Sequence, residues 1–261
     1  MSWAVNETVC EARPPERRRG WQAHAKASVL GLVVALSAVA TPRPAAAQFV
    51  GDLAFDPDGC MTKRECILRH PLRFIDAAKR IWQANAGDVT DGASIPEWAQ
   101  RIIGGPWDLS YLKAAVLHDH YCTKKEFSWR ETHLMFYEAL INLGVNEYKA
   151  KLMYYSVYLG GPRWLDVVGP TCGEGTKTPC GDAKPPAMAK VGEIAREARY
   201  DRMDMHKEMA DASAFMDANP GASLGQLRAM ADKKHPDDPF LKQEGAIQAG
   251  EPADRFMRSM K

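Results

Sequence analysis

Two adjacent residues in the middle of the chain, His118 and Asp119, carry the side chains best suited to chemistry. An imidazole exchanges a proton near neutral pH and binds metal ions in its neutral form, while a nearby carboxylate fixes the histidine tautomer or adds a ligand. A further histidine, His133, follows in a segment with helical spacing. We therefore expect His118 and Asp119 to act as a catalytic pair, and His118, Asp119 and His133 to be ligands of a metal site.

Four helices are expected around these residues, each marked by its own start and stop signals. Ser94 and Glu97 have the spacing of a capping box, which predicts a helix over 94–103 that the glycines after Ile103 end. Ser128 and Glu131 repeat that spacing further along. The remaining helices are expected over 111–122 with Ser110 as cap, over 129–143 with Ser128 as cap, and over 147–159 with Asn146 as cap.

The second and third of these helices are joined by a loop centred on Lys125. In an antiparallel helix hairpin, residues equidistant from the loop lie at the same level, and His118 and His133 are nearly equidistant from it. Both belong to apolar stripes with i, i+3, i+4 spacing. The two histidines should therefore face each other, whereas His120 should point to another side of its helix.

The same residues have a second interpretation without function. A histidine on an apolar helix face is commonly a core residue, so His118, Asp119 and His133 would form a buried polar network that fixes helix packing. Asp91 and Ser94 are expected to supply binding groups from the preceding loop, although a turn and a helix cap also explain them. No Gly-x-Ser-x-Gly elbow surrounds Ser94, so we do not expect it to be a nucleophile.

The first 47 residues have the features of a signal peptide. Basic residues at Arg17–Arg19 and Lys26 precede a short apolar run over Val29–Val39, and small residues end at Ala47. That run is shorter than the roughly 20 residues that cross a bilayer, so we expect cleavage after Ala47 and no membrane span in the mature chain. The protein should be periplasmic or secreted; the alternative is an uncleaved N-terminal anchor.

Charge and cysteine content agree with an exported protein that does not bind nucleic acid. The chain has 34 basic and 33 acidic residues, so it lacks the excess of basic residues that is typical of nucleic-acid binding. Two close cysteine pairs, Cys60 with Cys66 and Cys172 with Cys180, lie in loop-like sequence and predict disulfides formed in an oxidising compartment. Cys122 is left over and is interpreted as a small buried hydrophobic residue.

The predicted fold is mainly α with a small N-terminal β element. Strands are expected only over 49–55 and 66–75, before the run of helices. The expected organisation is a signal peptide over 1–47, a globular helical domain over 48–168, a disulfide-clipped linker over 169–187 and a charged, helical and partly disordered extension over 188–261.

Five motifs, in this order, resemble the bacterial and phage family called domain of unknown function 1353. The resemblance implies the family's fold and the location of its site, but no reaction. In that pattern an aspartate is expected in the third helix, where this chain has His133. The motifs are Thr90–Pro96, Ala114–Asp119, Arg130–Phe136, Leu143–Val145 and Leu152–Val157.

A shorter resemblance concerns His118–Cys122, which is similar to the His-Asp helix of secreted phospholipase A2 with tyrosine and cysteine transposed. It implies that His118 is a general base and Asp119 a calcium ligand. Together these patterns predict an exported hydrolase, assisted by calcium or zinc, that acts on an envelope lipid ester or a wall component. The alternative is a non-catalytic interaction module.

Overall fold

The computed structural model describes residues 47–62, 65–171, 187–201 and 204–260, which lie within one compact unit. These residues form nine strands in three sheets and eight α-helices. The predicted signal segment up to residue 46, as well as Cys172 and Cys180, lies outside the described residues. No described helix is long and apolar enough to cross a membrane.

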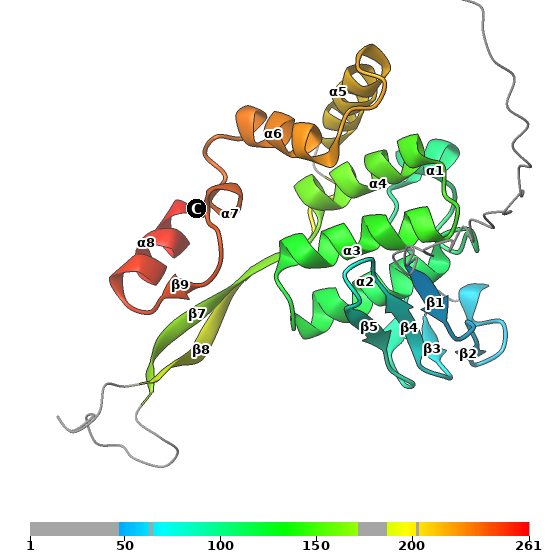
Figure 1. The fold of residues 1–261 in the computed structure, drawn as a ribbon, viewed down its shortest axis with the longest axis horizontal. Coiled ribbons are helices and arrows are strands. Elements are labelled where there is room, and N and C mark those ends of the chain that lie inside the picture. Colours follow the sequence, from blue (N-terminus) through cyan, green and yellow to red (C-terminus); the bar gives the residue numbers. More distant parts are fainter. Residues whose placement is uncertain (1–46, 63–64, 172–186, 202–203, 261) are drawn as a thin grey trace, which may run out of the picture. The chain divides into compact units, whose positions relative to one another are not determined.

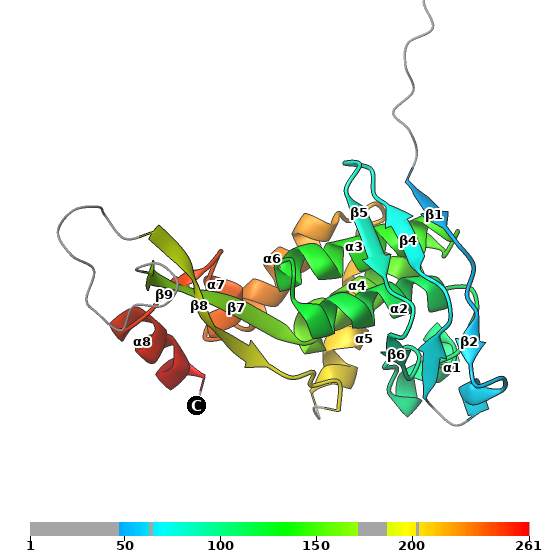
Figure 2. The same cartoon turned by 90° about the horizontal axis from the view of Figure 1, so that it is seen from below.

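Two small antiparallel sheets open the described chain (Figures 1 and 2). Phe49 pairs with Phe74, which pairs with Trp82, so that bulky side chains of three strands meet on one face. Phe74 and Trp82 are buried against the helices. One sheet has the order β1 (Gln48–Val50), β4 (Leu72–Ile75) and β5 (Ile81–Ala84), and the other has β2 (Phe55–Asp56), β3 (Cys66–Leu68) and β6 (Val89–Thr90).

The four central helices are α1 (Glu97–Ile103), α2 (Leu112–Lys124), α3 (Trp129–Asn142) and α4 (Glu147–Gly160). The caps predicted for α3 and α4 are confirmed: Ser128 and Glu131 form a capping box, and Asn146 accepts hydrogen bonds from the first turn of α4. The caps predicted at Ser94 and Ser110 are wrong. α1 starts after Pro96 and α2 after Tyr111, neither with a side-chain cap.

The second part of the described chain adds strands as well as helices. A long antiparallel hairpin joins β7 (Arg163–Thr171) to β8 (Ala187–Arg196), and β9 (Ile247–Gln248) pairs with β7 in parallel. The remaining helices are α5 (Met205–Ala218), α6 (Leu224–Lys234), α7 (Pro239–Lys242) and α8 (Glu251–Ser259). α5 and α6 pack on the main core. A separate small core unites β7, β8, β9, α7 and α8 through Leu165, Val167, Ile194, Phe240, Ile247, Ala253 and Phe256.

The fold is therefore α+β, and the prediction of a mainly α protein is wrong. The apolar residues of 188–198 suggested a helix, but β7 offers that segment a hydrogen-bonding partner, and residues up to Arg196 form β8. At the other end, β5 and β6 were missed because strands of two to four residues are too short to display a clear alternation.

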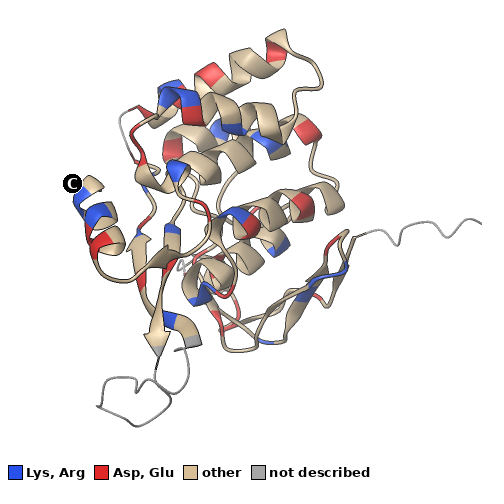
Figure 3. Cartoon of the chain, turned by 60° about the vertical axis from the view of Figure 1, so that its left-hand side comes forward, with Lys and Arg blue, Asp and Glu red and all other residues tan. Residues whose placement is uncertain are grey.

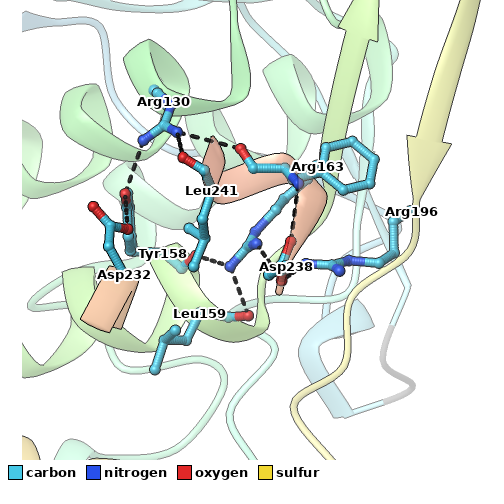
Figure 4. Close-up of polar contacts among 9 residues, drawn as sticks. Arg130, Tyr158, Leu159, Arg163, Arg196, Asp232, Asp238 and Leu241 are labelled. Carbon is cyan, nitrogen blue, oxygen red and sulfur yellow. Dashed lines mark hydrogen bonds and ion pairs between the residues drawn. The ribbon is translucent and has the colours of Figure 1, made fainter. Parts of the chain in front are cut away.

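A buried arginine links the hairpin to the helices (Figure 4). Arg163, at the start of β7, donates to the carbonyl oxygens of Tyr158 and Leu159 at 2.5 and 3.0 Å, and pairs with Asp238 at 2.8 Å. Arg196 reaches the same carboxylate at 2.8 Å. Burial lowers the pKa of Arg163 to about 10, so the guanidinium remains charged at neutral pH. This cluster holds the segment before α7 against the end of α4.

Acidic and basic residues are interspersed on the helices and strands (Figure 3). Many form close pairs, such as Lys125 with Glu193 at 2.6 Å and Lys234 with Asp211 at 2.5 Å. The expectation that the protein does not bind nucleic acid stays a prediction.

Candidate functional site

His118 and His133 meet across the α2–α3 hairpin, as predicted. His118 Nε2 lies 2.8 Å from His133 Nδ1, and both side chains are buried. The hairpin turns at Lys125, whose φ of 55° is left-handed, and α3 starts at the Ser128 cap. This short connection makes the two helices antiparallel neighbours and brings the two rings to the same level.

Cys122 completes a cluster that sequence reasoning did not assemble. Its Sγ lies 3.5 Å from His118 Nε2, and one donor atom from each of Cys122, His118 and His133 lies within 4.8 Å of the others. Cys122 follows His118 by one helical turn and shares its face, whereas Asp119 is turned about 100° away. The donor atoms that meet here are therefore those of His118, Cys122 and His133, and Asp119 lies outside this group; the expected metal ligands stay a prediction.

One of the distances in the cluster matches a tetrahedral zinc site, and the others require the side chains to move. With Zn–N near 2.1 Å and Zn–S near 2.3 Å, a nitrogen and a sulfur ligand lie about 3.6 Å apart, close to the separation between Cys122 and His118. Two nitrogen ligands lie about 3.4 Å apart. The hydrogen-bonded rings of His118 and His133 therefore need to separate by about half an ångström, and an ion would replace the proton that they share.

Burial sets the charge state of all three side chains. It lowers the pKa of His118 to about 4. Burial is also the main cause that lowers the pKa of His133 well below its ordinary value, and the charges of His118 and Arg163 lower it further. A backbone hydrogen bond at Pro162 acts in the opposite direction. The pKa of Cys122 is raised well above its ordinary value by burial and by Asp119. Both imidazoles are therefore neutral and the thiol is protonated near pH 7, which disfavours a cysteine nucleophile.

Asp119 lies beside this cluster with a different partner. Its Oδ2 accepts a hydrogen bond from Thr90 Oγ1 at 2.8 Å, and the same hydroxyl accepts from the backbone N–H of Gly92 at 3.1 Å. Burial raises the pKa of Asp119 to about 7, the Thr90 bond opposes this, and the charge of Asp91 adds to the rise. The side chain is half-buried and lines a cavity on one side and a shallow surface hollow on the other.

The cavity of about 140 Å³ is bounded by α1, α2, α3, α4 and the segment that leads into α5. Most of its wall is apolar: Ala93, Ile95, Pro96, Trp98, Ala99, Ile103, Ala115, Phe136, Leu152, Met153, Val157, Pro162, Ala198 and Met209. The other lining residues are Ser94, His118, Asp119, Cys122, Ser156 and Tyr200. No lysine or arginine lines it within the described ranges.

The loop residues predicted to bind, Asp91 and Ser94, are both exposed. Ser94 lines the cavity, Asp91 lines the outer hollow with Thr90 and Asp119, and both also line a third hollow. Gly92, between them, has φ +84°, and a Cβ there would lie 2.7 Å from the Pro106 carbonyl oxygen, so the turn requires glycine.

His120 points away from the cavity, as expected. Its Nδ1 lies 2.6 Å from a carboxylate oxygen of Asp88, and its ring contacts that of Tyr121 edge to face. The pair lies between α2 and the loop before β6. His120 therefore offers a matched comparison for the donor cluster, because it is a buried histidine of the same helix outside that cluster.

Sequence reasoning missed the far wall of the cavity. Tyr200, Ala198 and Met209 come from the segment that was expected to be a separate extension. Tyr200 packs so closely on α4 that a Cβ at Gly160 would lie 2.9 Å from its ring. The glycine at the end of α4 was interpreted as a stop signal, and nothing in the local sequence indicates what approaches it.

The fold and the site define an α+β protein with a buried His/Cys/His cluster beside an apolar cavity. A family model described as "Protein of unknown function (DUF1353)" matches residues 66–157, which contain the three donors and Asp119. The chain belongs to this family, as the resemblance predicted.

Two similar proteins come from Sinorhizobium fredii (strain NGR234). The uncharacterized protein y4iH is 34% identical over 182 residues, which cover 69% of this chain and 75% of that protein. The uncharacterized protein y4jT is 37% identical over 123 residues, covering 46% of this chain and 37% of that protein. No solved structure matches the chain.

Proposed function

We propose that this protein is a metal-dependent hydrolase in which His118, Cys122 and His133 hold the ion. The observation that carries the proposal is the convergence of three donor atoms from two helices within 4.8 Å, two of which, from His118 and Cys122, line a cavity. A nitrogen–nitrogen–sulfur set suits zinc, whereas calcium takes six to eight oxygen ligands. Of the two metals expected from the sequence, we therefore propose zinc.

Three protein ligands leave a fourth position for water or substrate, which is typical of catalytic rather than structural zinc. When bound there, zinc would polarise a carbonyl group and acidify water. We assign Asp119 as the proton acceptor, because its carboxylate lines the cavity beside His118 and Cys122 and the Thr90 hydroxyl orients it. His118, which the sequence suggested as base or ligand, then acts as a ligand.

The proposed reaction is hydrolysis of an ester or amide. Water adds to the carbonyl carbon and loses a proton to Asp119, the bond from carbon to the alcohol or amine breaks, and Asp119 returns the proton to the leaving group. One water is consumed, and a carboxylic acid and an alcohol or amine are released.

We further propose that the protein is exported, as the N-terminal segment predicts. The disulfide between Cys60 and Cys66 supports this proposal, because such bonds persist in oxidising compartments. The substrate would then be a molecule of the cell envelope or its surroundings.

The second candidate is a non-catalytic module in which the same residues form a buried polar network. The 2.8 Å hydrogen bond between His118 Nε2 and His133 Nδ1 favours it, because it gives one nitrogen of each neutral imidazole a partner without an ion; His133 Nε2 is buried without a hydrogen bond. In that case removal of one ring leaves its partner unpaired and destabilises the fold by about 1–3 kcal/mol.

The two candidates are separated by metal content. The experiment compares zinc binding by the mature protein and by the His118→Ala, Cys122→Ser and His133→Ala variants, with His120→Ala as the matched control. A metal-dependent hydrolase predicts one zinc per chain, lost in the three cluster variants and retained in His120→Ala. Cobalt in place of zinc should add a thiolate charge-transfer band that Cys122→Ser removes. No zinc in the wild type would refute the hydrolase proposal and leave the network.

A further inference from the structure

We infer that the cavity beside the donor cluster binds a small uncharged apolar group about the size of a benzene ring, so that the substrates are esters or amides of short-chain or aryl acids. This inference rests on the proposed function, because it names the substrate class for the same site. It excludes the long-chain lipid ester that the sequence suggested.

Volume limits the size of the group. An engineered apolar cavity of about 150 Å³ in another protein binds benzene, and this cavity measures about 140 Å³. A group of about six carbons therefore fills it. A membrane-lipid acyl chain has more than twice as many carbons, so it exceeds the volume of this cavity.

The lining determines the chemistry of the group. Trp98, Phe136 and Leu152 are among its apolar residues, and no lysine or arginine of the described chain balances a buried anion. A carboxylate or phosphate in the apolar part of the cavity, away from the donor cluster, would have no cationic side chain beside it. The group that fills the apolar part must therefore be uncharged, and the carbonyl of a neutral ester or amide would lie at the donor cluster, where the proposed zinc would supply positive charge.

The polar residues of the cavity lie mainly at one end, so an ester or amide substrate can bind in one orientation only. His118, Asp119 and Cys122 lie on α2, and Asp119 and Cys122 also line the outer hollow with Thr90 and Asp91. An acyl group in the cavity thus points its carbonyl at the donor cluster, and the alcohol or amine extends into the outer hollow. The scissile bond then lies beside Asp119 and Cys122, which line both the cavity and the outer hollow.

Two substitutions change the cavity volume in opposite directions. Ala115 is buried on α2 and lines the cavity, so Ala115→Leu fills it. Leu152 lines it from α4, so Leu152→Ala enlarges it. Neither residue belongs to the donor cluster, and zinc content together with a cooperative melt shows whether each variant retains the site and the fold.

The first test needs no activity. Benzene added to the zinc-free wild-type protein should raise the Tm and shift the NMR signals of residues around the cavity, and Ala115→Leu should abolish both effects. Unchanged Tm and signals in the wild type would overturn the inference, whatever the protein does with zinc.

The second test measures kcat/KM of the zinc-loaded protein for p-nitrophenyl esters from acetate to palmitate. We expect an optimum at about four to six carbons, which Ala115→Leu moves to shorter and Leu152→Ala to longer chains. A rate that rises steadily to palmitate would overturn the inference while the hydrolase proposal stands. Benzene binding without hydrolysis of any ester would remove the proposed function and leave the ligand class of the cavity supported.

Discussion

Acidification should unfold the metal-free protein because two neutral imidazoles are buried side by side. His118 and His133 are buried, and burial holds the pKa of His118 at about 4 and the pKa of His133 well below its ordinary value. In the unfolded chain both rings titrate near pH 6.5. The perturbation is a shift from pH 7.5 to pH 5.0 in the presence of a chelator.

The sign and the size follow from proton linkage. Above pH 6.5 both states have neutral rings, and the full stability is present. Below pH 6.5 the two histidines bind protons in the unfolded chain but not in the folded chain. The free energy of unfolding therefore falls until the pH reaches the pKa of the folded state. Each ring contributes about 1.4 kcal/mol per pH unit, and the pair together about 4 kcal/mol between pH 7.5 and 5.0.

The assay is urea denaturation at several pH values. The wild type should lose stability steeply below pH 6.5, and a His118→Gln/His133→Gln double variant should lose about 4 kcal/mol less over the same range. His70→Gln is the control, because His70 is exposed, and it should keep the wild-type pH dependence. If the free energy of unfolding depends on pH equally in the wild type and the double variant, the interpretation that both buried rings are neutral is refuted.

Other consequences of the structure can be measured in the same way. Arg163→Met should reduce the free energy of unfolding by about 2 kcal/mol, because it removes the buried donor to the Tyr158 and Leu159 carbonyl oxygens and leaves Asp238 with Arg196 alone; a loss below about 1 kcal/mol in urea denaturation would contradict that role. Thr90→Val should raise the pKa of Asp119 further and cost about 1 kcal/mol of stability, and an unchanged carboxyl titration by NMR would count against the hydrogen bond. Cys60→Ser should cost about 2 kcal/mol, since the disulfide closes a loop with a sequence separation of 6; reduction of the wild type should cause the same loss of Tm.

The meeting of His118 and His133 was predictable because short-range signals determine it. A capping box at Ser128 and a short turn produce an antiparallel hairpin, and a hairpin relates residues by their distance from the turn. Cys122 was visible on the same face but was interpreted as packing, because a cysteine on an apolar stripe gives no indication of a second role.

The far wall of the cavity was not predictable from local patterns. Tyr200 and Met209 are separated from α4 in sequence by the β7–β8 hairpin, and only tertiary packing brings them back to Gly160 and the cavity. The error in fold class has the same origin. Residues of β8 have ambiguous periodicity, and their strand conformation depends on pairing with β7.

The most direct test of the central claim is X-ray absorption at the zinc edge of the zinc-loaded mature protein. The account predicts one sulfur ligand at about 2.3 Å and nitrogen or oxygen ligands at about 2.1 Å. The sulfur shell should disappear in Cys122→Ser, and imidazole scattering should weaken in His133→Ala but not in His120→Ala. A spectrum without sulfur in the wild type, or one unchanged by these substitutions, would show that zinc binds elsewhere and would contradict the proposed site.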